Sequence, residues 1–286
     1  MNIYTTQSRH GILNHSRKTP GETEGYCRAT EYKRQLFCVF INGPTAIGPP
    51  MVMSRSAGTD WDPPVKLLED FHGYNTPTLF TFAEGLYALV PGVLGNALLL
   101  SYNDRARGFT DSRLLGFSID GTPSTAVLNN ELYVFYRTKG SRNVFYTSSA
   151  DLQVWSRSRT LKIDGSRSVL TDLCTSVVTY QGLVQVIYKS DDKTFDLLQF
   201  DGEGNWTRAR QLVTQPYAFD PAVVVHNGLL KLIFSERAGS DYSLWQYSFD
   251  GHSISGPVQS TELSASRSIA AAVLDGELVL MYRGAP

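Results

Sequence analysis

The chain has 286 residues, a formal net charge of −1 and 19% charged residues. This balance excludes the basic field typical of nucleic-acid-binding proteins and indicates no polybasic patch for anionic membranes. The 15 Tyr, 14 Phe and 4 Trp, together with frequent Val, Ile, Thr and Gly, favour strands and tight turns. A chain of this length can form one large β domain.

The N-terminal segment, MNIYTTQSRHGILNHSRKTP, lacks the apolar core of a signal peptide. We therefore expect a cytoplasmic protein, or one exported by a route that the sequence does not show. The longest apolar stretch, residues 85–100, is interrupted by Pro91, Gly92 and Gly95. It predicts two strands instead of a membrane span.

Cysteine and histidine indicate no cofactor chemistry. Cys27, Cys38 and Cys174 form an odd set without C-x-x-C spacing, which favours buried thiols over disulfides or zinc ligands. The five histidines lack H-x-x-x-H spacing or a cysteine partner. The sequence therefore predicts no metal site and no cofactor, and it leaves open only an unspecified calcium ion near acidic loops of a central channel.

A hairpin pattern recurs six times, in three clear and three looser copies: a small residue or Pro, an apolar run, a two-residue turn and a second apolar run that in most copies ends in an aromatic residue. In chain order the copies span residues 26–40, 76–90, 122–136, 174–188, 220–234 and 268–282. Three align without a gap: TPSTAVLNNELYVFY at 122–136, DPAVVVHNGLLKLIF at 220–234 and SIAAAVLDGELVLMY at 268–282. Turns such as Asn-Gly and Asp-Gly supply the positive φ that tight hairpins require. The spacing of roughly 45 to 50 residues is typical of propeller blades.

Each hairpin is followed by a second pair of strands, for example 143–149 and 155–163, so that four strands make one blade. The last hairpin has no second pair after it, but NIYTTQS at 2–8 matches NVFYTSS at 143–149, and residues 12–19 can supply the outer strand. We therefore predict an all-β, six-bladed β-propeller whose last blade is closed by N-terminal strands. The blades of this single domain span approximately residues 23–74, 75–119, 120–164, 165–214, 215–261, and 262–286 with 1–22.

Propeller geometry assigns each loop to one of two faces. The hairpin turns lie on one face, while the segments that lead into the hairpins and the loops that follow them lie on the other, around the central channel. These latter loops gather many of the charged side chains of a weakly charged chain, so we take their face as the ligand-binding face. The alternative is that loops are polar whatever their function. The candidate ligand-binding residues are Tyr74, Arg137, Lys189, Arg237, Arg267 and Arg283.

Four carboxylates on the same face, Asp120, Asp172, Asp220 and Glu236, are candidate catalytic residues if the protein is an enzyme. Carboxylates from different blades that meet at a channel mouth suit glycoside hydrolysis, where their separation decides the stereochemical outcome. Like charges held close would also raise one pKa and create an acid and base pair. The alternative is that an Asp before a strand caps a turn, above all at Asp120 and Asp220.

Degenerate motifs occur between the third and fourth strands of three blades. Residues 54–61 (SRSAGTDW) have the spacing of the S-x-D-x-G-x-x-W Asp-box with Ser56 in place of Asp, and residues 149–155 (SADLQVW) keep Asp151 and Trp155 without the Gly. Residues 201–206 (DGEGNW) are a further remnant. Together with the blade pattern, these motifs resemble six-bladed propellers of the sialidase-like and fucose-lectin-like type. The resemblance implies that the boxes are structural turns far from the active face.

The resemblance also implies carbohydrate chemistry. Sialidases hold the substrate carboxylate with three arginines, but their Arg-Ile-Pro motif is absent here. The segment around Asp220-Pro221 looks like one in five-bladed glycosidases, without their partner Glu motif. Propeller lectins bind sugars through Trp or Tyr stacking with Arg and Glu, and four Trp favour a few sites or one channel-mouth site. The arginines that could serve either chemistry are Arg28, Arg137, Arg237, Arg267 and Arg283.

We therefore predict a glycan-binding, lectin-like propeller. A glycoside hydrolase or other carbohydrate-active enzyme is the first alternative, and a protein-interaction scaffold is the second. The expected partner is a carbohydrate or another small polar ligand, with no nucleic acid and no membrane span. The sequence does not indicate the oligomeric state.

Overall fold

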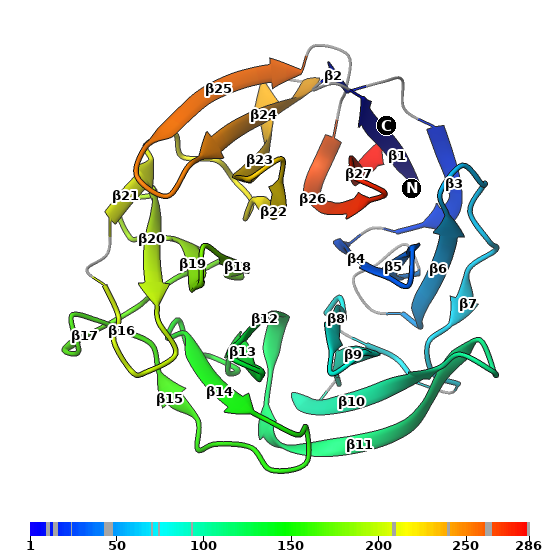
Figure 1. Ribbon diagram of the computed structural model, residues 1–286, viewed down its shortest axis with the longest axis horizontal. Helices are drawn as coiled ribbons and strands as arrows, with labels where there is room; N and C mark the ends of the chain where they lie inside the picture. Colours follow the sequence, from blue (N-terminus) through cyan, green and yellow to red (C-terminus); the bar gives the residue numbers. More distant parts are fainter. Residues whose placement is uncertain are drawn as a thin grey trace.

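The described part of the chain is a ring of six antiparallel sheets around a central channel (Figure 1). The computed structural model describes residues 1–9, 12–13, 17–23, 25–42, 48–69, 71–73, 75–92, 94–207, 210–238, 241–260 and 265–284, with the backbone alone for residues 9, 12–13, 237–238, 241–242 and 265–268. The predicted six-bladed β-propeller is thus confirmed.

Five blades are built from consecutive strands, ordered from the channel outwards. Blade 1 contains β4 (Cys27–Tyr32), β5 (Gln35–Ile41), β6 (Pro50–Ser56) and β7 (Val65–Lys66). Blade 2 contains β8 (Thr78–Phe82), β9 (Gly85–Pro91), β10 (Asn96–Asn103) and β11 (Gly108–Ser118). Blade 3 contains β12 (Asp120–Leu128), β13 (Glu131–Arg137), β14 (Phe145–Ser149) and β15 (Arg159–Thr160). Blade 4 contains β18 (Ser176–Tyr180), β19 (Leu183–Lys189), β20 (Phe195–Phe200) and β21 (Arg210–Val213), and blade 5 contains β22 (Ala222–His226), β23 (Leu229–Ala238), β24 (Asp241–Phe249) and β25 (Ile254–Ser260).

Blade 6 is assembled from both ends of the chain, as the sequence predicted. Its inner strands are β26 (Ala265–Leu274) and β27 (Glu277–Gly284), and β1 (Asn2–Arg9) pairs with β27 from Ile3 opposite Arg283 to Ser8 opposite Leu278. Two short strands, β2 (Ile12–Leu13) and β3 (Arg17–Glu22), both pair with β1 where one outer strand was expected. The predicted equivalence of residues 2–8 and 143–149 holds, because β1 and β14 are both third strands of their blades.

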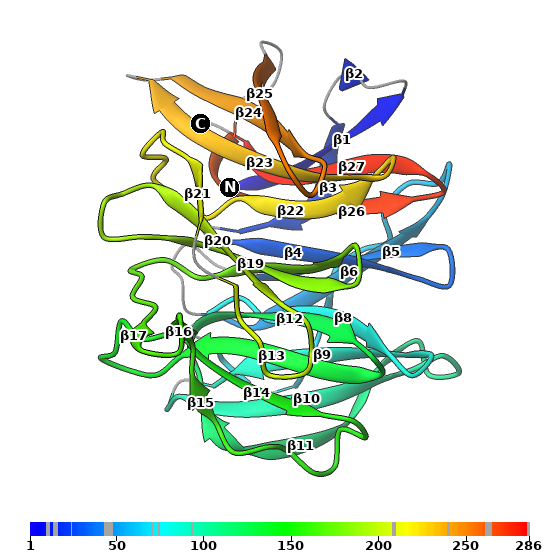
Figure 2. The same cartoon turned by 60° about the vertical axis from the view of Figure 1, so that its left-hand side comes forward.

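The outer part of blade 3 differs from the single strand expected over 155–163. Residues 155–158 precede the short β15, and a separate hairpin of β16 (Lys162–Ile163) and β17 (Arg167–Ser168) follows it (Figure 2). Leu161 joins the two parts, because its N–H donates to the Val144 carbonyl while its own carbonyl accepts from the Val169 N–H. The apolar pattern of residues 155–163 therefore continues although the chain first pairs with β14, through β15, and then with β17, through β16.

All six hairpins use the same two-residue turn. The two central residues of each have φ between 44° and 79°, as in a type I′ turn whose twist matches that of the flanking strands. Four turns meet this demand with Asn or Gly, whereas Lys33-Arg34 and Ala83-Glu84 adopt it without either. The turns are residues 33–34, 83–84, 129–130, 181–182, 227–228 and 275–276.

Polar side chains at the ends of innermost strands tie one blade to the next. The Tyr32 hydroxyl donates to the Glu84 carbonyl at 3.2 Å, and the Tyr180 hydroxyl donates to the Gly228 carbonyl at 2.9 Å. His226 Nε2 lies 2.9 Å from the Gly276 carbonyl oxygen in the same way. Each bond reaches the turn of the following hairpin, so these residues serve the ring and not a ligand site.

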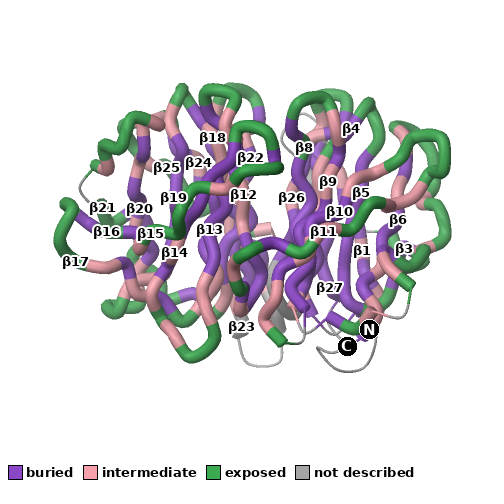
Figure 3. The backbone as a smooth tube through the Cα atoms, turned by 90° about the horizontal axis from the view of Figure 1, so that it is seen from below, coloured by how far each residue is buried: buried purple, intermediate pink, exposed green. Residues whose placement is uncertain are grey.

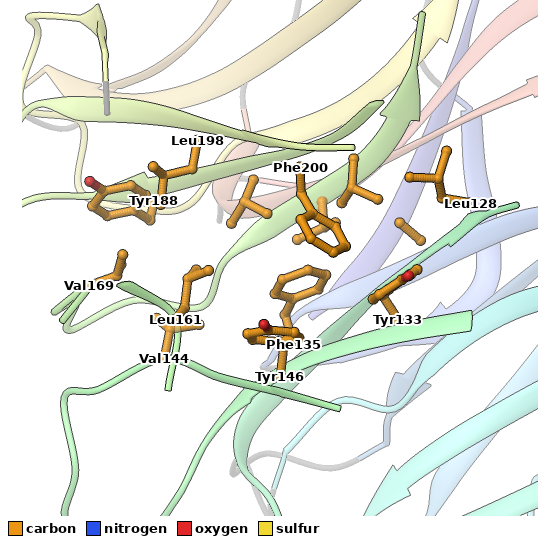
Figure 4. Close-up of a cluster of buried hydrophobic side chains, with 14 of the residues drawn as sticks. Leu128, Tyr133, Phe135, Val144, Tyr146, Leu161, Val169, Tyr188, Leu198 and Phe200 are labelled. Atoms are coloured by element: carbon orange, nitrogen blue, oxygen red, sulfur yellow. The ribbon is translucent and has the colours of Figure 1, made fainter. Parts of the chain in front are cut away.

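The hydrophobic core lies between neighbouring blades and not in one central mass. Between blades 3 and 4, Phe135 and Tyr146 stack with their ring centroids 5.9 Å apart, close to Phe200 and Trp206, whose centroids are 4.5 Å apart (Figure 4). Burial of such large rings is the main stabilising term for this interface. The channel is consequently lined by the innermost strands alone, which leaves it open to a ligand.

The ring has two distinct faces, and the two chain ends lie on the same one (Figure 3). We call the face that carries the hairpin turns the turn face. The opposite face carries the starts of the innermost strands, the loops after the second strands and both termini, and we call it the loop face. The described residues among those predicted to bind or react with a ligand lie near the ends of second strands or near the starts of innermost strands, as the loop face requires.

Candidate functional site

The channel contains a cavity of about 680 Å³ lined by the innermost strands of all six blades. This volume is within the range of small-molecule sites. Most of its wall is uncharged, with hydroxyls from residues such as Thr125 and Thr179 and methyl groups from residues such as Val223 and Ala271. The charged residues of the lining are Arg28 and Glu84, at opposite ends of innermost strands. A ligand in the cavity therefore meets its strongest polar partner, on the loop-face side, at Arg28.

Arg28 forms a buried ion pair with Asp220. Its Nη2 lies 2.9 Å from Asp220 Oδ2, and the two side chains are 20% and 2% exposed. Nη1 donates to the Cys27 carbonyl at 3.2 Å. Burial alone would lower the pKa of Arg28, but the attraction of Asp220 and of weaker neighbours outweighs it and raises that pKa. The pair spans from blade 1 to blade 5 and so brackets blade 6 between them.

Asp220 is fixed at the start of blade 5, and only one of its two carboxylate oxygens has a hydrogen-bond partner among protein groups. Burial raises the pKa of its carboxyl group, and Arg28 and Arg137 offset part of that rise. Oδ1 is buried without a hydrogen-bond partner among protein groups. The Ser176 hydroxyl donates at 2.6 Å to the carbonyl of Pro221, which fixes the start of β22. A buried carboxylate oxygen with no partner can accept a hydrogen bond from a water or a ligand hydroxyl.

Cys174 and Arg137 complete the group on the blade 3 and blade 4 side. The Thr122 N–H donates to Cys174 Sγ at 3.3 Å. Gly121 permits this close approach, since a Cβ there would lie 3.3 Å from both Cys174 Sγ and Arg137 Nη2. Arg137 Nη1 donates to the Thr171 carbonyl at 3.3 Å, while its buried Nε has no partner. We call Arg28, Arg137, Cys174 and Asp220 the channel cluster.

The surroundings of the Cys174 thiol in the channel cluster disfavour its thiolate form. Burial, together with the Asp220 carboxylate, raises the pKa of Cys174 to about 11, against the smaller opposing effects of Arg28 and Arg137. A small cavity of about 10 Å³, roughly the space of one water, lies beside it and is lined in part by Asp120 and Arg137. Cys27 and Cys38 are buried free thiols inside blade 1, as predicted.

The other predicted residues are dispersed around the loop face. Asp172 is exposed, and its Oδ1 lies 2.6 Å from Nε of Arg142. Nη2 of the same arginine lies 2.5 Å from Oδ1 of Asp191. Lys189 donates to the Tyr217 carbonyl at 2.6 Å, and burial lowers its pKa. Glu236 is half-buried on β23.

Arg283 is 6% exposed and its Nε lies 2.7 Å from Met1 Sδ, within blade 6. Tyr74 and the side chains of Arg237 and Arg267 lie outside the described residues. Of the ten predicted positions, the structure thus places Asp220 and Arg137 in the channel cluster and Asp120 at its border.

Two members of the channel cluster did not stand out in the sequence. Arg28 was one of several arginines, and Cys174 was expected to be an inert buried thiol. Tyr26 adds an aromatic ring at the same place, with the Arg28 guanidinium carbon 5.7 Å from its centroid. The available signal was the residue type at this position of the repeat, where the other five copies carry Ala, Ser or Thr and only the first carries an arginine.

A second buried arginine lies away from the channel, in β6 of blade 1. Arg55 is 8% exposed, and its guanidinium carbon lies 5.3 Å from the ring centroid of Trp61. Its Nε and Nη2 have no hydrogen-bond partner. Burial lowers the pKa of Arg55, and the carboxylates of Glu277 and Asp60 offset this only in part.

The Asp-box remnants form structural turns on the turn face, as the resemblance to sialidase-like propellers implied. Asp151 Oδ1 accepts the N–H groups of Gln153 at 2.7 Å and Val154 at 2.8 Å, which lowers the pKa of Asp151. Trp155 then packs on Phe117 of blade 2, with ring centroids 5.4 Å apart. These residues stabilise the blades and do not contribute to the channel cluster.

Known proteins resemble this chain in fold but not in sequence. No family model and no curated protein matches the chain. A mutant of the Aleuria aurantia lectin in complex with Fucα1-6GlcNAc superposes with a TM-score of 0.64 at 12% identity, covering 92% of this chain and 90% of the lectin. SapL1 lectin in complex with α-methyl fucoside gives a TM-score of 0.62 at 11% identity, with 88% and 87% covered.

An α-L-arabinofuranosidase from Clostridium thermocellum is also similar, with a TM-score of 0.54 at 12% identity over 84% of this chain and 96% of the enzyme. The protein is thus a six-bladed β-propeller that matches fucose-specific lectins in structure at low sequence identity.

The described residues include no helix whose length and apolar character would let it span a membrane. They also contain no group of three or more His, Cys, Asp or Glu side chains arranged to hold a metal ion.

Proposed function

We propose that this propeller binds a carbohydrate at a single site in the channel, with the channel cluster at its loop-face end. The observation that carries the proposal is a cavity of about 680 Å³ whose wall is mostly uncharged and whose loop-face end carries Arg28, a cation held by its ion pair with Asp220. Sites for small polar ligands combine such a wall with a few convergent polar groups.

The charges of the cluster favour a neutral, hydroxyl-rich ligand. Arg28 is matched by Asp220, and Arg137 faces Asp120 across neighbouring strands, so the site presents donors and acceptors with little net charge. Arg28, the member of the channel cluster that lines the cavity, would donate to a ligand oxygen, and the hydroxyls of Thr125 and Thr179 in the wall would exchange hydrogen bonds with ligand hydroxyls. The Tyr26 ring beside Arg28 would offer a surface for the apolar face of a sugar.

The fold likeness supports the same ligand class. The lectin structures similar to this chain hold Fucα1-6GlcNAc or α-methyl fucoside. For the hydrolase alternative, Asp220 supplies a carboxyl group of raised pKa, but it is engaged by Arg28, and the exposed Asp172 is engaged by Arg142. Binding without turnover is therefore the function we propose.

The test is a glycan array followed by calorimetric titration of the best ligand, with α-methyl fucoside as the first probe. Arg137→Gln and Arg28→Lys each remove or misplace one charge-assisted hydrogen bond, so we expect affinity to fall by roughly 10- to 100-fold. Lys33→Ala, on the turn face, is the control and should bind normally. Circular dichroism establishes that each variant is folded. A folded protein that binds no glycan, or variants with unchanged affinity, would overturn the proposal, and release of free sugar from chromogenic glycosides would favour the enzyme.

A further inference from the structure

The outer edge of blade 3 carries a concentration of positive charge that the chain-wide balance conceals. Between residues 157 and 167 the exposed side chains include four cations and one acid, Asp164, in a chain whose net charge is −1. We call these four cations the basic edge. They are Arg157, Arg159, Lys162 and Arg167.

The local structure directs the basic edge outwards. Leu161 is fully buried and Ile163 is 7% exposed, whereas Arg157, Arg159 and Lys162 on either side of Leu161 are exposed. Arg167 on β17 is the cross-strand partner of Ile163, so its exposed side chain leaves the hairpin on the Ile163 side, in the field of Asp196 of blade 4.

None of the four cations forms an ion pair with any described residue. Other exposed cations do, among them Lys33 with Asp104, Lys66 with Glu69 and Arg142 with Asp172. Asp196 on β20 lies in the field of Arg167, but its hydrogen bond comes from Thr194. Four uncompensated cations on one edge attract a flexible polyanion and release its counterions.

We propose that the basic edge binds an acidic polysaccharide, a chain bearing sulfate or carboxylate groups. Charge complementarity carries the choice of a polyanion. The absence of an exposed aromatic side chain from residues 156–168 argues against nucleic acid, whose single strands are held by stacking on aromatic rings. The nearest ring along the chain, Trp155, packs on Phe117. Guanidinium groups, three of the four cations, match sulfate and carboxylate oxygens in pairs.

The test uses heparin as the sulfated probe and neutral dextran as its uncharged counterpart. One variant combines Arg157→Gln, Arg159→Gln, Lys162→Gln and Arg167→Gln. A matched variant removes four exposed cations elsewhere through Lys33→Gln, Arg34→Gln, Lys66→Gln and Arg105→Gln. We expect wild type and the matched variant to bind heparin but not dextran. Raising salt from 50 to 200 mM should weaken this binding on the order of tens of fold, and the basic-edge variant should lose it.

Equal loss in both variants would overturn the proposal, because only net charge would then matter. Tighter binding to single-stranded DNA than to heparin would replace it with a nucleic-acid surface, and self-association abolished by the basic-edge variant would replace it with a second copy. The Arg28→Lys variant should keep full heparin affinity. Failure here and failure of the channel proposal are therefore distinguishable.

Discussion

Blade 1 contains two buried arginines whose environments differ in one respect. Arg28, on the innermost strand, has a carboxylate 2.9 Å away, and its pKa is raised. Arg55, on the third strand, stacks against Trp61 with two partnerless nitrogens, and its pKa is lowered. A guanidinium can therefore be buried in two ways: beside a carboxylate that balances its charge, or against an aromatic ring that leaves the charge unbalanced. Only the ion pair links two blades of the propeller.

The largest expected effect follows from breaking the channel pair. Asp220→Ala leaves the Arg28 guanidinium buried without its counter-ion, so we expect the free energy of unfolding to fall by about 3 kcal/mol. The double variant Arg28→Met, Asp220→Ala removes both charges and should recover most of that loss. Urea unfolding followed by tryptophan fluorescence measures both. A double variant as unstable as the single one would show that the charge pairing is not what matters.

A smaller effect should appear as a pH dependence. The folded-state pKa of Asp220 is raised by burial, so the folded state retains this proton to higher pH than the unfolded state does. Stability contributed by Asp220 is therefore present below the unfolded pKa, near 4, and is lost as pH rises towards the folded pKa. Asp220→Asn should abolish that decline.

Asp250 provides the opposite case and a control for the titration. Backbone N–H groups of Ser253 and His252 lower the pKa of Asp250 to about 2. Its contribution is present above the unfolded pKa and is lost as pH falls from about 4 towards 2. In urea unfolding measured at a series of pH values, Asp250→Asn should change the free energy of unfolding only below about pH 4. If Asp220→Asn gave the same dependence on pH as wild type, the raised pKa of Asp220 would be contradicted.

The smallest effect is expected at Arg55. Arg55→Met keeps a long side chain against Trp61 and removes an unpaired buried charge, so we expect stability to rise by about 1 kcal/mol, net of the lost cation–π contact. Thermal unfolding against wild type measures the change. A drop of similar size would mean that a bound water or ligand normally satisfies Nε and Nη2.

The fold was readable from the sequence because its determinants are local. Three of the six turns carry a recognisable Asn-Gly, Asp-Gly or Gln-Gly pair, and the other hairpins could be counted from the matching apolar runs around their turns. The shared blade followed from the match between residues 2–8 and 143–149. The outer strands were read less well, because β15, β16 and β17 are two residues each and depend on which neighbour they pair with.

The site was harder to predict because its contacts are not local. Arg28 and Asp220 are 192 residues apart and meet only when blade 6 closes the ring between them. Asp220 was chosen for its position before a strand, but nothing near it in the sequence names its partner. Asp172 also precedes an innermost strand, but it lies two residues farther from that strand than Asp220 does, and it pairs with Arg142 at the surface. In the repeat Asp220 corresponds to Cys174, so a carboxylate before an innermost strand does not by itself mark the channel cluster.

The closure of blade 6 has a mechanical consequence. Because β1 runs antiparallel to β27 with Ile3 opposite Arg283, the two chain ends leave the sheet side by side. Tension applied between them would load that pair first and then each following pair in turn as far as Ser8 and Leu278, as a zipper opens, instead of shearing all the bonds together. The blade that completes the ring is thus the one through which a pulling force, from a translocase or a protease, would enter it.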